Sequence, residues 1–257
     1  MTDDADSGSG VGLTGRPPRE IPEPKPLTSH GPAKVVAMCN QKGGVGKTTS
    51  TINLGAAIAE YGRRVLLVDL DPQGALSAGL GVPHYELEHT IHNLLVEPRV
   101  PIDDVVMNTR VKHMDLIPSN IDLSAAEIQL VNEVGREQTL ARALDPVLDR
   151  YDYVLIDCQP SLGLLTVNGL AGSDGVIIPT ECEYFSLRGL ALLTDTVEKV
   201  RDRLNPKLEI TGILITRTVR FPETSVAGEP ITTWAPKSIG AQAYRSLARE
   251  VIDRFGK

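Results

Sequence analysis

The chain has 257 residues, of which 41% are hydrophobic and 23% charged, and its formal net charge is −7. This length suits one α/β domain with a substantial core, and no apolar run is long enough to span a bilayer. The negative charge argues against nucleic-acid binding by the whole surface. Three widely separated cysteines without metal-ligand spacing indicate reduced thiols, as in a cytoplasmic protein.

The first predicted segment is a leader over residues 1–32, which hold six prolines and five glycines and show no helical or strand period. We expect this leader to be disordered and a single domain to occupy residues 33–257. Within the domain, short apolar runs with β-branched residues predict buried parallel strands. In chain order they cover residues 34–39, 65–69, 114–117, 153–157, 175–179 and 209–216.

Helical patterns separate these predicted strands. They cover residues 48–61, 122–150 with a break near Gly135, 186–204 and 238–255, and Gly62 is the expected residue just after the first helix. Strands that alternate with helices predict a doubly wound α/β fold, in which helices cover both faces of a mostly parallel sheet.

A glycine-rich loop, NQKGGVGKTT, joins the first predicted strand to the first predicted helix. This context is the one that a phosphate-binding loop requires, because backbone N–H groups and the helix N-terminus then face phosphate oxygens. Lys47 would contact the β- and γ-phosphates, and the Thr48 hydroxyl would bind Mg²⁺. The expected nucleotide-binding residues are Lys42, Gly43, Gly44, Val45, Gly46, Lys47, Thr48 and Thr49.

The loop departs from the standard GxxxxGK[ST] motif, because Gln41 stands where that motif has its first glycine and Lys42 follows. The form KGGVGKTT resembles the deviant Walker A loop of the ParA/MinD family of P-loop NTPases. The resemblance implies a homodimer that closes around two ATP molecules, with Lys42 reaching the partner's phosphates. A cation at that point would oppose the charge that develops on the leaving phosphate.

Three aspartates follow two of the predicted strands. Asp69 and Asp71 lie in VDLDPQG, and Asp157 ends the run YVLID, so all three are expected at the carboxyl edge of the sheet, where ligands bind. The resemblance implies that Asp71 orients the attacking water, that Asp69 supports the Mg²⁺ shell and that Asp157 holds Mg²⁺ through water. The alternative for each aspartate is a cap on a loop or helix. The implied catalytic residues are Lys42, Lys47 and Asp71, and the implied metal site comprises Thr48, Asp69 and Asp157.

The resemblance runs from about residue 34 to residue 255 and includes VLLVDLDPQG, YDYVLIDCQPSLG and VIIPTECEYFSLRGL. Gln159, Glu181 and Arg188 stand where the family more often has proline, glutamine and glutamate. A larger departure follows Thr216, which runs directly into an RTVR segment that family members place after a further helix and strand. About thirty residues are therefore expected to be missing there, a length that fits one crossover with its strand.

The family resemblance implies an ATPase that hydrolyses ATP slowly until a ParB-like partner stimulates it and that partitions a chromosome or plasmid. Its ATP state would bind double-stranded DNA without sequence preference, through Arg220 and neighbouring cations. The protein would therefore be cytoplasmic and associated with the nucleoid. Residues 188–257 carry twelve Lys and Arg against eight Asp and Glu, which fits a local DNA-binding patch, although solvated helix faces would give the same excess.

The alternative is a MinD-like positioning ATPase that acts at a membrane or on another protein cargo. We expect no membrane contact, because the apolar stripe of the last predicted helix, which includes Tyr244 and Val251, is expected to face the core. A guanine-specific GTPase would show an NKxD motif, and the chain has no Asn-Lys pair.

Overall fold

The computed structural model describes residues 21–97, 99–181, 186–216 and 228–257. Its described strands form one seven-stranded sheet in the order β3-β4-β2-β5-β1-β6-β7. Neighbouring strands are parallel, except that β3 is antiparallel to β4. The strands are β1 Lys34–Met38, β2 Val65–Leu70, β3 Met107–Asn108, β4 Met114–Ile117, β5 Tyr153–Cys158, β6 Gly175–Thr180 and β7 Glu209–Ile215.

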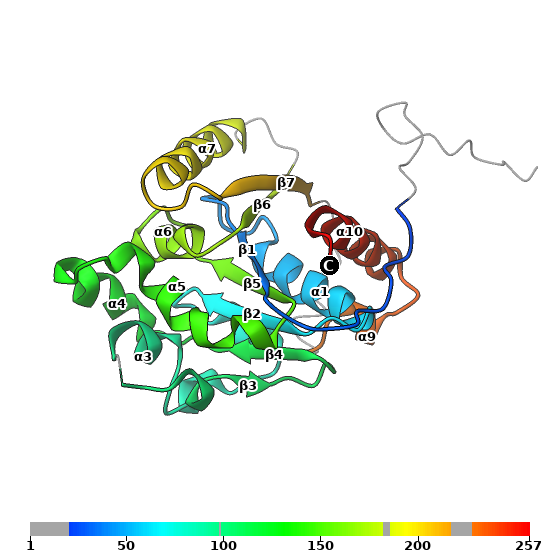
Figure 1. Cartoon of the computed structure of the whole chain (residues 1–257), viewed down its shortest axis with the longest axis horizontal. Coiled ribbons are helices and arrows are strands. Elements are labelled where there is room, and N and C mark those ends of the chain that lie inside the picture. Colours follow the sequence, from blue (N-terminus) through cyan, green and yellow to red (C-terminus); the bar gives the residue numbers. More distant parts are fainter. Residues whose placement is uncertain (1–20, 98, 182–185, 217–227) are drawn as a thin grey trace, which may run out of the picture.

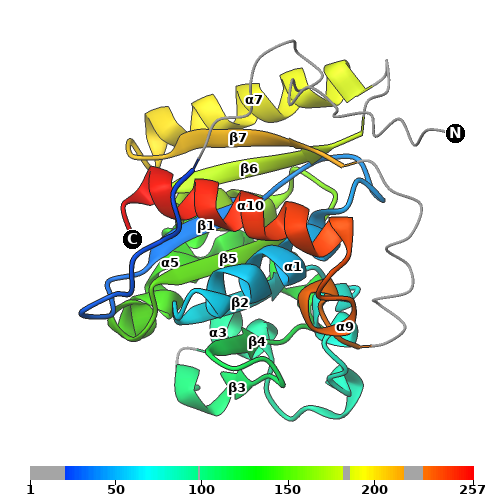
Figure 2. The same cartoon turned by 90° about the vertical axis from the view of Figure 1, so that its right-hand side faces the viewer.

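Helices cover both faces of this sheet (Figures 1 and 2). One face carries α1 Lys47–Glu60, α9 Ile231–Trp234 and α10 Ile239–Phe255, and the other carries α3 Ile91–Val96, α4 Leu123–Gln129, α5 Thr139–Leu144, α6 Leu164–Ala171 and α7 Ser186–Arg203. A short α2, Ala75–Gly79, follows β2. The 3₁₀ helices are η1 His84–Glu86, η2 Ile102–Asp104, η3 Leu130–Asn132, η4 Arg136–Gln138 and η5 Asp145–Arg150. The doubly wound α/β fold that the sequence predicts is therefore confirmed.

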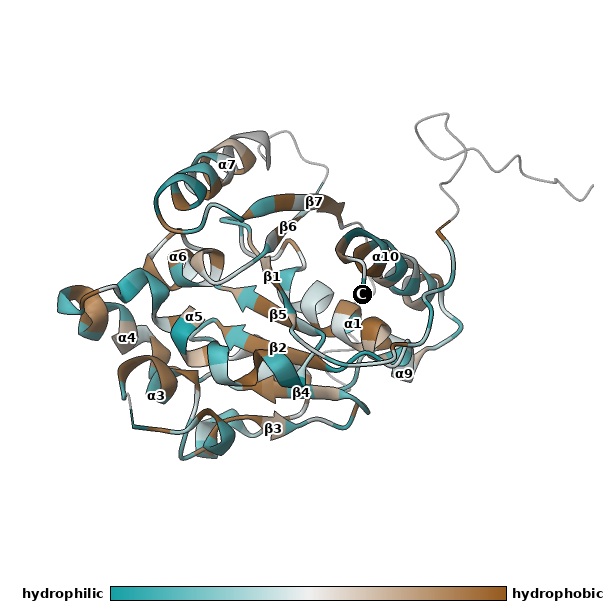
Figure 3. Cartoon of the chain, viewed as in Figure 1, coloured by the Kyte–Doolittle hydropathy of each residue, from teal (hydrophilic) through white to brown (hydrophobic). Residues whose placement is uncertain are grey.

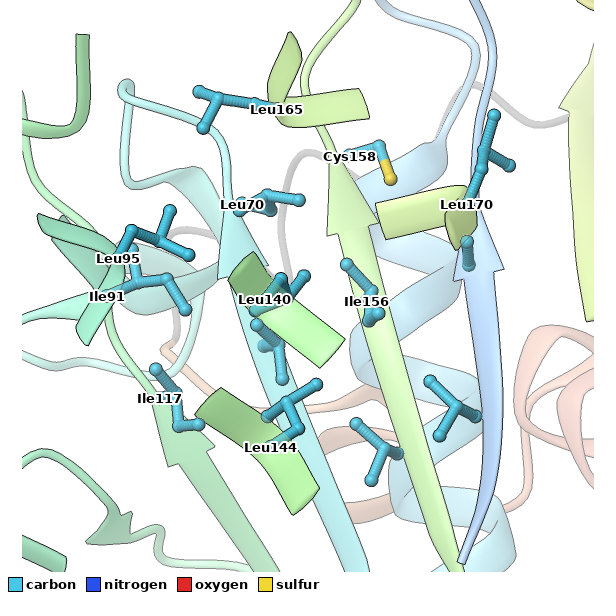
Figure 4. Close-up of a cluster of buried hydrophobic side chains, with 14 of the residues drawn as sticks. Leu70, Ile91, Leu95, Ile117, Leu140, Leu144, Ile156, Cys158, Leu165 and Leu170 are labelled. Carbon is cyan, nitrogen blue, oxygen red and sulfur yellow. The ribbon is translucent and has the colours of Figure 1, made fainter. Parts of the chain in front are cut away.

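Two apolar clusters hold the layers together, one on each face of the sheet. In β1, Val36 and Met38 pack toward α1 and α10, whereas Val35 and Ala37 pack toward α5, α6 and α7. Side chains alternate in this way because successive residues of a strand point to opposite faces. Figure 4 shows the cluster on the face covered by α5, α6 and α7, in which leucine and isoleucine side chains of the helices lie over β2 and β5. Strands buried on both faces explain why the sequence shows continuous apolar runs there.

The predicted strands are confirmed to within about a residue at each end, as are the first and last helices. Gly62 follows α1 with φ 78°, a conformation that favours glycine, and its N–H bonds to the Ala59 carbonyl. The predicted helical stretch over 122–150 breaks at Gly135, which has φ 67°, as the sequence indicates. On either side of the break it forms short α- and 3₁₀-helical segments rather than two long helices, with Pro146 in η5.

Disorder of the leader over residues 1–32 stays a prediction, since residues 1–20 lie outside the described part of the chain. Residues 21–32 form no helix or strand, but they contact the domain at the amino edge of the sheet. Buried Asp152 accepts hydrogen bonds from the His30 ring at 2.7 Å and from the Gly31 N–H at 3.1 Å. Arg63 donates to the Lys25 carbonyl at 2.8 Å. The second half of the leader is therefore tied to the side of the sheet opposite the loop that follows β1.

Within the described part of the chain, no helix is both long and apolar enough to cross a membrane.

Candidate active site

The loop between β1 and α1 has the backbone that its glycines predict. Gly44 and Gly46 have φ 75° and 82°, conformations that other residues adopt at a cost. A Cβ atom added at Gly43 or Gly44 would meet nothing within 4 Å, so this part of the loop faces open space. Helix α1 begins directly after Gly46, with no side-chain cap and no acidic residue in its first turn. Its N–H groups and positive dipole end are therefore available to an anion.

Two lysines of the loop lie differently. Lys47, at the start of α1, is only 7% exposed, and its Nζ donates to the Lys42 carbonyl at 3.3 Å, so its ammonium group folds back over the loop. Lys42 extends outward, and its Nζ forms an ion pair with Glu181 Oε2 at 3.0 Å. The Lys42 N–H bonds to Asn40 Oδ1, and the Asn40 amide donates to the Pro179 carbonyl at 2.6 Å, which anchors the loop to the end of β6.

The end of β7 fixes the other side of the loop. Thr216 directly follows β7, and its hydroxyl donates to the Val45 carbonyl at 2.9 Å and to the Thr180 carbonyl at 3.2 Å. Val45 is buried below the loop, and Thr49 lies in the first turn of α1 with its carbonyl bonded to the Asn53 amide. The loop is thus held by three neighbouring strand ends, those of β1, β6 and β7.

Thr48 and Asp157 meet at the carboxyl edge of the sheet. The Thr48 hydroxyl donates to Asp157 Oδ2 at 2.6 Å, and Asp157 Oδ1 is buried with no hydrogen-bond partner among the described residues. Burial, followed by the negative charge of Asp69 on the neighbouring strand, raises the pKa of Asp157 to about 8. A buried carboxylate oxygen that lacks a partner, beside a hydroxyl on a phosphate loop, fits the hard oxygen ligands that Mg²⁺ requires.

Asp69 pairs in register with Asp157, but its carboxylate is used within the protein. Asp69 Oδ2 accepts from the Ser77 N–H at 2.9 Å and the Ser77 hydroxyl at 2.7 Å, and Oδ1 accepts from the Asp71 N–H at 3.3 Å. Burial raises the pKa of Asp69 to about 7 against these hydrogen bonds. Ser77 in turn accepts from the Ser119 N–H at 3.1 Å, so this chain of contacts joins β2, α2 and the end of β4.

Asp71 lies just past β2, half-buried, and its Oδ1 accepts from the Gln73 N–H at 2.9 Å. This loop packs tightly against His84. A Cβ atom at Gly74, which has φ 62°, would lie 2.6 Å from the His84 ring and 2.9 Å from the Ser119 carbonyl oxygen. No sequence motif marks His84 or Ser77, because residues that support a loop can come from elements separated in sequence.

The loop after Asp157 has a further support that no sequence motif indicates. Gln159 Nε2 donates to Glu127 Oε1 of α4 at 3.2 Å, and the Leu165 N–H at the start of α6 donates to the same oxygen at 3.2 Å. Glu127 therefore connects α4 to the segment two residues after Asp157. The structure thus brings the phosphate loop and its two lysines, Asp69, Asp71 and Asp157 to one edge of the sheet, while Arg220 lies outside the described residues.

The chain is similar to known proteins over most of its length. The sequence profile of an AAA domain family matches residues 33–210. An uncharacterized protein of Mycobacterium tuberculosis is 77% identical over 286 aligned positions, which cover 100% of this chain and 90% of that protein. The sporulation initiation inhibitor protein Soj of Bacillus subtilis is 43% identical, with 85% of this chain and 98% of Soj covered.

A solved structure of the same fold is described with ligands bound. The crystal structure described as cobyrinic acid a,c-diamide synthase from Mycobacterium smegmatis, with a bound ATP analog and magnesium, has a TM-score of 0.77. It is 38% identical to this chain, and the match covers 88% of this chain and 96% of that one. The nucleotide and the metal that the phosphate loop and Asp157 predict are thus both bound in a close structural relative.

Proposed function

The chain belongs to the ParA/MinD family of P-loop ATPases, and from this premise we propose that it is a switch that dimerises on ATP and then binds double-stranded DNA. ATP is its substrate and Mg²⁺ its cofactor. The single observation that carries the proposal is the geometry of Lys47, Thr48 and Asp157 around an uncapped helix N-terminus.

The loop would hold the triphosphate by its backbone. Successive N–H groups from Gly43 to Thr49 would bind phosphate oxygens, and Lys47 would turn from the Lys42 carbonyl to the β- and γ-phosphates. Thr48 and Asp157 would hold Mg²⁺, which when bound would neutralise charge on the phosphate oxygens. These contacts would need only side-chain rotation and no change of the backbone, because Lys47 and Thr48 already lie at the mouth of the loop.

Hydrolysis would need two further groups. Asp71, half-buried at the end of β2, would orient the attacking water, and Asp69 would keep the Asp71 loop in place through its bonds to the Asp71 N–H and to Ser77. Lys42 extends away from its own phosphate loop, which fits a role at the phosphates of a second protomer. Basal hydrolysis would therefore be slow in the monomer and would rise when a partner stabilises the closed dimer.

We further propose that the chain binds DNA and partitions a chromosome or plasmid. The relatives named chromosome partitioning protein ParA in Myxococcus xanthus and Caulobacter vibrioides support it, each 41% identical to this chain. The basic balance of residues 188–257, which include Arg220, would supply the phosphate-backbone contacts, and a ParB-like protein would stimulate release. We propose that the ATP state lies on the nucleoid.

The missing segment after Thr216 also belongs to the proposal. The alignment with the Mycobacterium tuberculosis relative spans 286 positions although this chain has 257 residues, which supports a segment that the relative has and this chain lacks. Such a deletion would change the edge next to β7, where Ile213 and Ile215 are more than half exposed.

Other functions on this fold have less support. An amide synthase that takes ammonia from glutamine would use a reactive thiol, but the cysteines in the described part of the chain, Cys39 and Cys158, are buried at strand ends. A MinD-like action at a membrane would need an exposed amphipathic helix, whereas Tyr244 and Val251 of α10 face the core.

The test measures binding of a labelled DNA duplex to the purified chain by fluorescence anisotropy, in the presence of ATP, of ADP or of no nucleotide. We expect the duplex to bind only when Mg–ATP is present, with an affinity that falls steeply between about 50 and 200 mM salt. Arg220→Ala should weaken this binding about tenfold, whereas Lys112→Ala, which removes an exposed lysine from the turn before β4 and lies outside residues 188–257, should leave it unchanged. Binding that is independent of ATP, or unaffected by Arg220→Ala, would contradict the proposal.

A further inference from the structure

A hollow of about 510 Å³ lies between α3, α4, α5 and the 3₁₀ segments next to them, away from the phosphate loop. Most of its lining side chains are apolar, among them Leu94, Val96, Val100, Leu130, Val134 and Pro146. Glu97, Gln129, Glu133 and Arg142 line it as well. We call this hollow the α3–α5 groove.

Exposed apolar side chains extend this groove along α4 and η3. Ile128 is 77% exposed, Val131 51% and Val134 94%. Single exposed apolar residues are ordinary on protein surfaces, but three at spacings of three residues beside an apolar hollow form a patch. In Figure 3 brown, hydrophobic ribbon marks α3 and part of α4 at this end of the molecule. A patch longer than the hollow itself favours a ligand of the length of a helix over a small molecule.

The lining of the groove carries more acidic than basic side chains. At the groove itself Glu97 and Glu133 stand against Arg142, whose guanidinium bonds to the Thr139 hydroxyl of the same helix at 3.1 Å. A ligand with cationic side chains beside its apolar ones would therefore match this surface.

We propose that the α3–α5 groove docks an amphipathic helix of a partner protein, with the helix's apolar face on the groove and its Lys and Arg side chains against the acidic surroundings. A second copy of this chain fits less well, because a two-fold axis would place one acidic surface against its own equivalent. An anionic membrane surface would be repelled by the same charges.

The position of the groove gives such a partner access to the nucleotide site. Gln129, the last residue of α4, and Leu130, the first of η3, line the groove and lie two and three residues after Glu127. Glu127 in turn accepts hydrogen bonds from Gln159 and from the Leu165 N–H. A helix seated against α4 would restrict Glu127 and through it the loop that follows Asp157. This step rests on the proposed function, since it assigns that loop to the ATP site, and Glu127 acts in it as a positioning residue.

The experiment measures binding of a fluorescein-labelled, 18-residue helical peptide made of Leu and Lys to the full chain, by fluorescence anisotropy. The control peptide has Glu in place of Lys. We expect the Leu/Lys peptide to bind, and Val134→Asp or Ile128→Asp to weaken it at least tenfold. Ile213→Asp, on exposed β7, is the matched control and should change the affinity by less than twofold. Circular dichroism confirms that each variant is folded.

The proposal would be overturned if Ile213→Asp weakened peptide binding as much as Val134→Asp does, or if the Leu/Glu peptide bound as tightly as the Leu/Lys peptide. It would also be overturned if the main effect of Val134→Asp were a change in ATP-dependent dimerisation, measured by light scattering. The patch would then belong to the contact between copies of the chain. These readings need no hydrolysis, so they decide the docking surface even if the proposed function is wrong.

Coupling to the nucleotide site has its own readout. Peptide binding should lower amide hydrogen exchange in residues 159–165 at least threefold in the parent chain. Glu127→Ala should keep the peptide affinity but lose this protection, and Glu127→Gln, which retains an acceptor oxygen, should restore part of it. Unchanged exchange in the parent chain, or full protection in Glu127→Ala, would contradict the coupling.

Discussion

Replacing Asp157 by asparagine should stabilise the nucleotide-free protein at alkaline pH, although it removes a predicted Mg²⁺ ligand. An aspartate in an unfolded chain has a pKa near 3.9, whereas burial and the neighbouring charge of Asp69 raise that of folded Asp157 to about 8. The folded state therefore binds the proton more tightly. The stability that Asp157 contributes is fully present below about pH 4 and is lost as the pH rises toward 8.

Asparagine does not titrate, and its carbonyl oxygen can still accept the Thr48 hydroxyl. The stability difference in favour of asparagine should grow by about 1 kcal/mol per pH unit between pH 4 and pH 8 and then level off. Between pH 6 and pH 8 this amounts to about 2 kcal/mol, or an increase of about 4–8 °C in the difference between the two melting temperatures for a chain of this size.

Thermal melts of the parent chain and of Asp157→Asn at pH 6, 7 and 8, in EDTA, would measure this. Asp195→Asn, which alters an exposed aspartate paired with Lys199, is the control and should shift the melting temperature little at any of these values. Added Mg–ATP should reverse the order, because only the parent keeps the carboxylate. A variant that is less stable than the parent at pH 8 without ligand, or a difference independent of pH, would refute the reasoning.

Three further substitutions test the site. Asp71→Ala should lower ATP turnover about 100-fold or more while ATP binding and dimerisation persist. Turnover assays and light scattering measure the two effects in parallel. Turnover at the parent rate would show that Asp71 does not orient the attacking water. Lys47→Ala should weaken ATP binding at least about 100-fold by calorimetry without loss of the fold, and near-parent affinity would be inconsistent with its place over the loop. Gly74→Ala should cost about 2–3 kcal/mol of unfolding free energy in urea, because its φ of 62° and the close His84 ring and Ser119 carbonyl leave no room for a methyl group; a neutral result would show that the loop relaxes freely.

Much of the fold could be predicted because the central strands are buried on both faces and carry unbroken apolar runs. The phosphate loop could be predicted from spacing alone, since its glycines and Lys47 must lie between a strand and a helix to bind phosphate. In the segment 122–150 the helical character and the break at Gly135 could be predicted, but its division into short α- and 3₁₀-helical pieces could not, because each piece is too short to show a period of its own. The short antiparallel β3 and the helices α2, α3 and α6 also have too few residues to show a period of their own.

The supporting contacts of the site are tertiary and leave no pattern in the sequence. Lys42 and Glu181 are 139 residues apart, and the Glu127–Gln159 bond joins elements 32 residues apart. Asp69 shows the same difficulty. Its spacing from Asp71 indicates a metal-site pair, but only the structure shows that Ser77 takes up Asp69 Oδ2. The role of Asp69 in the Mg²⁺ shell stays a prediction, as do those of Asp71 and Arg220.

Calorimetric titration of the purified chain with ATP measures whether the phosphate loop binds a nucleotide. We expect one ATP per chain in the presence of Mg²⁺, markedly weaker binding in EDTA, and weak binding for Lys47→Ala. A folded parent chain that shows no heat of ATP binding in Mg²⁺, or that binds equally well after Lys47→Ala, would contradict this expectation.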